Sequence, residues 1–169
     1  MSDVQRRKAE LRAQRLARRS ALPADRRTAA GRLIRDAVLD SPQVQMAGTV
    51  AAYYSIGTEP DTRGLVFALW KRGSYVLLPV LRPDGDLDWA SYEGPDSLVP
   101  ALAVDPAGRR LGRGGGSYDR ALARVGPLIP LIALLYDDEL VEQVPTAPHD
   151  IPARAAVTPR TGITLLAQA

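Results

Sequence analysis

Glycine, arginine and aspartate gather in residues 108–120 in a pattern typical of a phosphate site. This stretch of 13 residues contains five glycines and four arginines. Glycine allows close approach of a ligand to the backbone, and successive backbone N–H groups can form a concave anion site. The planar guanidinium of arginine matches phosphate oxygens. Asp119, near the end of this stretch, could hold Mg²⁺, which binds through one or two carboxylates plus substrate phosphates. The pattern therefore predicts a nucleotide-phosphate site.

Familiar phosphate and nucleophile motifs do not fit this segment. A P-loop would need a lysine near its end, and none is present. The dinucleotide fingerprint would need a glycine where Ser117 stands, and a serine-hydrolase elbow would need one where Asp119 stands. A surface hairpin with solvated arginines remains the alternative reading.

The same segment resembles the "RLGxGxGYYD" signature of the 5-formyltetrahydrofolate cyclo-ligases, and residues 99–105 are similar to that family's "vPgxaFD" lead-in. Three further blocks match in order: residues 8–12 resemble "KxxLR", residues 53–62 resemble "gE.dT", and His149-Asp150 with residues 157–159 resembles "hD…vvTe". Each block is weak alone, but four blocks in the right order span nearly the whole chain.

The resemblance implies ATP-dependent cyclisation of 5-formyltetrahydrofolate to 5,10-methenyltetrahydrofolate, with ATP and Mg²⁺ as cofactors. The residues that would bind ATP are Lys8, Arg12, Arg110, Leu111, Gly112, Arg113, Gly114, Gly115, Gly116, Ser117 and Tyr118. Those that would contact the folate are Tyr54, Glu59, Gly115 and Ser117. Asp119 and Asp150 would hold the metal, and Arg113 and Asp119 would be catalytic.

The chain departs from the family pattern in two places. Ser117 replaces the first of two tyrosines, and the segment between Ser97 and Leu98 is roughly two dozen residues shorter than the pattern. Either the protein has lost a loop, or the sequence lacks residues that the protein contains. The second explanation is favoured because mobile active-site loops have low local stability. It predicts Cα atoms of Ser97 and Leu98 much farther apart than about 3.8 Å.

Composition is typical of one compact domain over residues 1–169, with 46% apolar and 24% charged residues. The absence of cysteine excludes disulfides, and one histidine excludes a multi-histidine metal site. No apolar run approaches the roughly 20 residues needed to cross a bilayer. We therefore expect a cytoplasmic monomer that acts on small molecules, without membrane or nucleic-acid partners.

The N-terminal arm is strongly basic, since residues 1–30 hold nine basic and three acidic side chains. The helical spacing of Arg15, Arg18 and Arg19 predicts a solvated helix face. A nucleic-acid-binding module is one alternative function, but aromatic residues interleaved with the basic ones would be expected, and none precedes Tyr53. A catalytically silent nucleotide-binding member of the family is the other.

Helical and strand patterns alternate along the chain. We expect helices over residues 4–20, from 23 to 39, 62–72 and 118–125, and strands over 49–56, 75–81, 86–92, 98–104, 128–136 and 156–158. This alternation predicts an α/β fold with a mostly parallel sheet. The family resemblance implies a three-layer α/β/α Rossmann-like fold. In such sheets ligands bind outside the carboxyl ends of strands, where the glycine-rich segment and Glu59 would lie.

Overall fold

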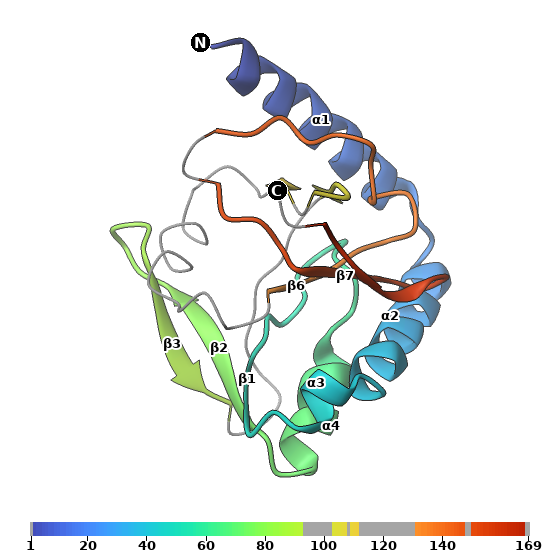
Figure 1. Ribbon diagram of the computed structural model, residues 1–169, viewed down its shortest axis with the longest axis vertical. Helices are drawn as coiled ribbons and strands as arrows, with labels where there is room; N and C mark the ends of the chain where they lie inside the picture. Colours follow the sequence, from blue (N-terminus) through green and yellow to red (C-terminus); the bar gives the residue numbers. More distant parts are fainter. Residues whose placement is uncertain (1, 93–102, 108, 112–130, 148–149, 168–169) are drawn as a thin grey trace.

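The structure is a computed structural model that describes residues 2–92, 103–107, 109–111, 131–147 and 150–167 (Figure 1). It opens with α1 (Asp3–Ala21), α2 (Ala24–Leu39) and the short α3 (Pro42–Gln45). Ser2 and Gln5 form a capping box at the start of α1, which satisfies N–H groups that have no partner inside the helix. Pro23 separates α1 from α2, because proline is accepted at a helix start but not in its interior. The two long helices confirm the sequence prediction.

The first sheet contains β1 (Thr49–Ala51), β2 (Tyr75–Leu81) and β3 (Leu87–Ser91) in that order. β1 and β2 are parallel and are connected through α4 (Arg63–Lys71). β3 returns antiparallel to β2 after a tight turn in which Gly85 has a φ of 81°. The predicted strand over 49–56 is shorter than expected, because the chain leaves the sheet after Ala51.

The C-terminal sheet contains β6 (Ile132–Leu134), β7 (Ala155–Thr158) and β8 (Gly162–Leu165). β6 and β7 are parallel, and β8 forms an antiparallel hairpin with β7. β8 was not expected from the sequence, nor was α3. A third, two-stranded antiparallel sheet pairs β4 (Ala103–Val104) with β5 (Arg110–Leu111). The predicted helix over 118–125 lies outside the described residues.

The prediction of one mostly parallel sheet in a three-layer Rossmann-like fold is not confirmed. The described strands form three small sheets, and each of the two three-stranded sheets combines one parallel and one antiparallel pair. The cause is local. Turns of a few residues connect β2 to β3 and β7 to β8, and such short connections permit only antiparallel pairing. The described residues do form an α/β fold, but its sheets are mixed rather than mostly parallel.

One hydrophobic core joins the two three-stranded sheets through α2 and α4. Its fully buried members include Ile34 of α2, Val66 of α4 and Leu78 of β2, together with Val157 of β7. Figure 1 places α2 between α4 and the β7–β8 hairpin. Because α2 packs against α4 and against the β7–β8 hairpin, and α4 packs against β2, α2 helps to fix the position of the loop that runs from β1 to α4.

At Gly31, α2 and that loop lie in very close contact. A Cβ atom at Gly31 would lie 2.7 Å from Asp61 Cβ and 2.8 Å from the Asp61 carbonyl oxygen. The carbonyl belongs to the backbone, so it cannot move aside as a flexible side chain could. Only glycine allows this contact between the helix and the loop.

We predict that Gly31→Ala destabilises the protein, although alanine is the better helix former by about 1 kcal/mol. Overpacking costs about 1–3 kcal/mol, so denaturant unfolding should show a net loss. Gly64→Ala in α4 is the matched control, because its Cβ would meet only the Arg35 side chain at 3.6 Å. Gly64→Ala should be neutral or stabilising, and equal effects at both positions would contradict the close contact.

Candidate functional site

Three segments that the sequence assigns to the nucleotide meet at α1. Lys8 Nζ forms an ion pair with Asp150 Oδ2, and the two side chains are 11% and 10% exposed. Leu11, one turn further along α1, packs with Leu111, Val144 and Val141 in one apolar cluster. The helix, the entry to the glycine-rich segment and the C-terminal loop are thereby brought together.

The Lys8–Asp150 contact joins a predicted phosphate ligand to a predicted metal ligand. Asp150 Oδ2 also accepts a hydrogen bond of 2.7 Å from the backbone N–H of Ala147. A buried ion pair must overcome the desolvation of both charges, so additional hydrogen bonds of this kind matter for its stability. A lysine and a carboxylate side by side can serve an anionic ligand and its counter-cation respectively.

The prediction of a solvated face for Arg15 and Arg19 is wrong. Arg19 donates from Nε and Nη2 to the two carboxylate oxygens of Glu139, and both side chains are almost completely buried. Arg15 and Arg18 both pair with Asp138, at 3.3 and 3.2 Å. Arg15 is buried, whereas Arg18 is about half exposed. Helical spacing could not reveal these acidic partners, because they lie about 120 residues away along the chain.

Burial and hydrogen bonding shift the pKa values of Arg19 and Glu139 in opposite directions. Burial raises the pKa of Glu139, and the hydrogen bonds from Arg19 and the Tyr136 N–H only partly oppose it. For Arg19, burial acts to lower the pKa, but the hydrogen bond to Glu139 turns the net shift upward. The guanidinium therefore stays charged, in a bidentate contact that provides both charge and geometry.

Tyr136 connects this pair to the loop that carries Glu59. The Arg19 guanidinium carbon lies 5.7 Å from the centre of the Tyr136 ring, within the range of a cation–π contact. The Tyr136 hydroxyl donates to the Thr58 carbonyl oxygen at 3.3 Å. Burial raises the pKa of Tyr136 to about 12. The hydroxyl is therefore protonated at neutral pH and remains a donor.

The loop from Tyr53 to Thr62 is closed by its own hydrogen bonds. Thr62 Oγ1 donates to the Tyr53 carbonyl at 2.6 Å and accepts from Ser55 N at 3.0 Å. Within the loop, Glu59 is 3% exposed, and its Oε2 accepts from Ile56 N at 2.8 Å. The structure therefore gives Glu59 a role in closing a turn, beside any role toward a ligand.

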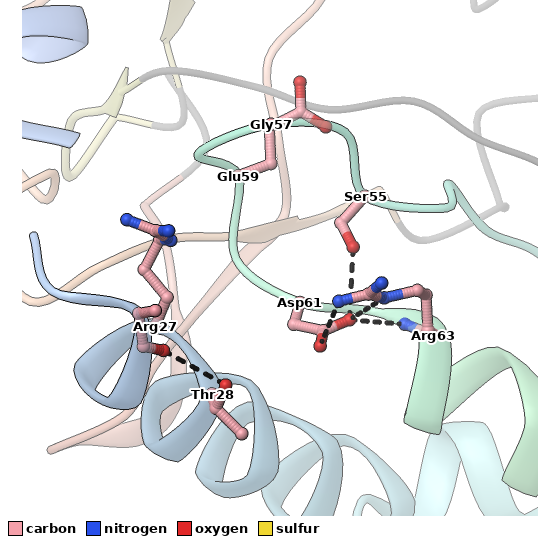
Figure 2. Close-up of a pocket in the computed structure, with 8 residues that line it drawn as sticks. Arg27, Thr28, Ser55, Gly57, Glu59, Asp61 and Arg63 are labelled. Carbon is pink, nitrogen blue, oxygen red and sulfur yellow. Dashed lines mark hydrogen bonds and ion pairs between the residues drawn. The ribbon is translucent and has the colours of Figure 1, made fainter. Parts of the chain in front are cut away.

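A polar cleft of about 200 Å³ lies between this loop and the first turns of α2 (Figure 2). Its lining residues are Ala24, Arg27, Thr28, Ser55, Gly57, Glu59, Asp61 and Arg63. Asp61 accepts from Arg63 at 2.9 and 3.0 Å and from Ser55 Oγ at 3.2 Å. The hydrogen bond from Arg63 is the main reason why the pKa of Asp61 is lowered. The cleft thus presents charged groups of both signs.

The structure locates only part of the predicted site. Lys8, Leu111 and Asp150 lie around one end of α1, together with Arg12. Tyr54 and Glu59 lie on the loop between β1 and α4, where the Tyr54 ring centre is 6.5 Å from that of Tyr92. Arg110 lies in β5, where its backbone pairs with that of Val104 in β4. The predicted roles of Gly112, Arg113, Gly114, Gly115, Gly116, Ser117, Tyr118 and Asp119 fall outside the described residues and stay predictions.

Sequence reasoning missed three residues with structural importance: Asp105, Tyr136 and Glu139. Asp105 belongs to the lead-in block, but nothing in its spacing indicated what it binds.

Among the described residues, no group of three or more His, Cys, Asp or Glu side chains is suited to a metal ion. In the same part of the chain, no helix is long and apolar enough to cross a membrane.

Comparison with known proteins gives the family. The sequence model of the 5-formyltetrahydrofolate cyclo-ligase family matches residues 4–98 and 97–159. The chain belongs to this family. It is 37% identical over 149 residues to a 5-formyltetrahydrofolate cyclo-ligase of Mycolicibacterium smegmatis, covering 70% of this chain and 77% of the relative. With the Escherichia coli K12 cyclo-ligase it shares 33% identity over 176 residues, covering 84% and 94%.

Solved structures agree with the fold. A 5,10-methenyltetrahydrofolate synthetase from Mycoplasma pneumoniae superposes with a TM-score of 0.77 at 21% identity, covering 90% of this chain and 99% of that one. The Aquifex aeolicus 5,10-methenyltetrahydrofolate synthetase also gives 0.77, at 24% identity, covering 96% and 94%. These similarities confirm an arrangement of helices and strands shared with the family's enzymes.

The comparisons also locate the short segment. The family match divides into two parts that meet at residues 97–98, the position where the sequence predicts missing residues. In the alignment with the E. coli relative, 84% of the 169 residues, or about 142, fill 176 positions, so about 34 positions are gaps in this chain. Ser97 and Leu98 lie outside the described residues, so the choice between a lost loop and omitted residues stays a prediction.

We predict that Glu139→Gln destabilises the protein by about 3 kcal/mol or more, because it leaves the buried Arg19 charge without its counter-charge. Asp138→Asn is the matched control. Asp138 is 46% exposed, and Arg15 keeps its hydrogen bond to the Asp138 backbone carbonyl when the carboxylate is neutralised, so we expect a loss close to the about 0–1 kcal/mol of exposed ion pairs. Denaturant unfolding of both variants measures the difference. Similar losses for the two neighbours would contradict the special role of the buried pair.

Proposed function

We propose that this chain catalyses the ATP- and Mg²⁺-dependent cyclisation of 5-formyltetrahydrofolate to 5,10-methenyltetrahydrofolate, with release of ADP and phosphate. Family membership supports the reaction. The observation that carries the proposal is the meeting of Lys8, Leu111 and Asp150 around α1. These residues come from three segments that the nucleotide site needs and that lie far apart in the sequence.

The proposed chemistry needs no covalent intermediate on the protein. The formyl group is a poor electrophile, and its oxygen is a poor leaving group. Transfer of the γ-phosphoryl group of ATP to the formyl oxygen releases ADP and makes that oxygen a good leaving group. The N10 amine then attacks the formyl carbon, which closes the five-membered ring; N10 loses its proton, and the C–O bond breaks as inorganic phosphate departs. The protein must align two ligands and neutralise the charge of the transferred group.

On the nucleotide side, the phosphates would be held by Lys8 and Arg12 from α1 and by Arg110, Arg113 and the amides of Gly112 and Gly114–Gly116. Asp119 and Asp150 would hold Mg²⁺, whose role when bound is to neutralise phosphate charge. The carboxylate of Asp150 fits this role, because it lies beside the cationic Lys8 in a partly buried position. Phosphate oxygens would then replace the carboxylate as the counter-charge of Lys8.

On the folate side, Glu59 would accept hydrogen bonds from the pterin ring, and Tyr54, Gly115 and Ser117 would line the same pocket. Glu59 is supported by its place on a tightly closed loop, where the Ile56 N–H already holds Oε2. A carboxylate fixed in this way costs little entropy when a ligand binds. The polar cleft beside the loop offers Arg27, Thr28 and Arg63 as further polar contacts.

Two alternatives differ in what they predict. A catalytically silent member of the family would bind ATP without turnover, and the short segment at residues 97–98 and Ser117 favour it. A nucleic-acid-binding module would need its basic arm exposed. Lys8, Arg15 and Arg19 are instead buried in ion pairs, which argues against the module. The proposal also includes a monomer as the active unit and the cytoplasm as its location, in agreement with a sequence without cysteine.

The direct test is the absorbance change that accompanies methenyltetrahydrofolate formation, measured with 5-formyltetrahydrofolate and Mg²⁺, with and without ATP. We expect turnover only when ATP and Mg²⁺ are both present, with one ADP formed per product. ATP binding without turnover would identify the silent member. Turnover that is unchanged after chelation of Mg²⁺ would remove the metal from the proposal.

The two substrate sites can be separated by a crossed pair of variants. Arg113→Ala should weaken ATP binding and leave folate binding nearly unchanged. Glu59→Gln should weaken folate binding about tenfold to a hundredfold, because a buried donor without its partner costs about 1–3 kcal/mol. Calorimetric titration of each ligand gives the four affinities. Normal folate affinity in Glu59→Gln would leave this residue only its role in closing the turn.

A further inference from the structure

Among the described residues near the proposed nucleotide site, Asp105 is the most completely buried carboxylate. It follows β4 directly and is 0% exposed. Oδ1 accepts from the backbone N–H groups of Ala107 and Arg109 at 3.1 and 2.9 Å. Oδ2 accepts from Arg109 Nε at 2.6 Å and from Val144 N at 2.7 Å. Each carboxylate oxygen therefore serves two donors, and the charge is balanced by the Arg109 guanidinium.

These bonds fix the turn that leads into the glycine-rich segment. Asp105 N also donates to the Arg109 carbonyl at 3.1 Å, so the turn is closed by both the backbone and the side chain of one residue. The chain then passes through β5, and Leu111 is fully buried against Leu11 of α1. The stretch that begins at Asp105 and ends at Leu111 is thus fixed at both ends, by the Asp105 carboxylate at one end and by apolar packing of Leu111 at the other.

The bond from Val144 extends this control to the C-terminal loop. Val144 begins the stretch that reaches Asp150, the partner of Lys8. Every described hydrogen bond to the Asp105 carboxylate comes either from this loop or from the turn at residues 105–109. None of these donors belongs to the loop from Tyr53 to Thr62, where the folate would bind.

We propose that Asp105 is a positioning residue for the nucleotide: it fixes the turn that precedes Arg110 and Leu111 and connects this turn to the loop that reaches Asp150. The inference rests on the proposed function. Asp105 is too deeply buried to touch substrate, so it acts only through the segments that it holds. A purely structural residue would affect both substrates alike, whereas a positioning residue for the nucleotide affects ATP alone.

Asp105→Asn tests this with little change in shape. The amide keeps one acceptor oxygen, but its NH₂ group faces two N–H donors. Steady-state kinetics should show a KM for ATP raised about tenfold or more, because small displacements of positioned groups have large effects. The KM for 5-formyltetrahydrofolate should stay within about twofold of the original value. This change is smaller than the effect expected from the loss of a single hydrogen bond.

The matched control is Asp84→Asn, which makes the same chemical change in another turn. Asp84 Oδ1 accepts from Asp86 N at 3.0 Å in the exposed turn between β2 and β3. Both KM values should be unchanged in this variant. Folding of each variant is checked by a cooperative thermal transition before the kinetics are compared.

Arg109→Lys decides the question if Asp105→Asn does not fold. Lysine keeps the positive charge but lacks the Nε donor, so one of the four bonds to the carboxylate is lost. We expect the KM for ATP to rise about threefold, as for a single lost hydrogen bond, without a change for folate. Equal changes in both KM values, or none in a folded variant, would overturn the role of Asp105. If the unmodified protein shows no turnover, the proposed function fails instead, and calorimetric ATP affinities of the same variants test Asp105.

Discussion

The buried contact between Arg19 and Glu139 is the interaction on which the arrangement of this protein depends. The buried side chains of α1 are Lys8, Arg15 and Arg19, all of them basic. The helix is therefore attached mainly by charged contacts rather than by an apolar face. Such contacts are stable only when the geometry is good and the remaining polar atoms are satisfied. The bidentate pair, reinforced by the Tyr136 N–H, meets that requirement at the C-terminal end of the helix.

The partner of α1 is the stretch of residues 136–147, which runs beside the helix in Figure 1 (orange), together with Asp150. Asp138 and Glu139 bind the last turns of α1, and Asp150 binds Lys8 near its start. Between them, Val144 contacts Asp105. At the other end, the Tyr136 hydroxyl reaches the Thr58 carbonyl. One irregular segment thereby connects the proposed nucleotide residues to the loop proposed for folate.

The chain is shorter than the family pattern at residues 97–98, a place in the sequence apart from the contacts described above. The division in the family match falls just after β3, whereas the described core joins α2 and α4 to β2, β6 and β7. The family's overall fold is present although the chain is shorter than the family pattern at this point, as the TM-score of 0.77 over 90% of the chain indicates. The contacts that fix α1, the turn at Asp105 and the Glu59 loop all come from other parts of the sequence.

The sequence by itself determined the long helices, the main strands, the family and the blocks in which the site is proposed, because these depend on local periodicity and short motifs. It could not determine that the sheets are mixed, since strand direction depends on how hairpins pair after the chain turns. It also misjudged Arg15 and Arg19, because their acidic partners are distant in the sequence and charge spacing on one helix does not reveal them. Only the tertiary structure decided that Lys8 meets Asp150 and that Asp105 holds the turn before the glycine-rich segment, because buried charges are stabilised by partners that folding alone brings within hydrogen-bonding distance.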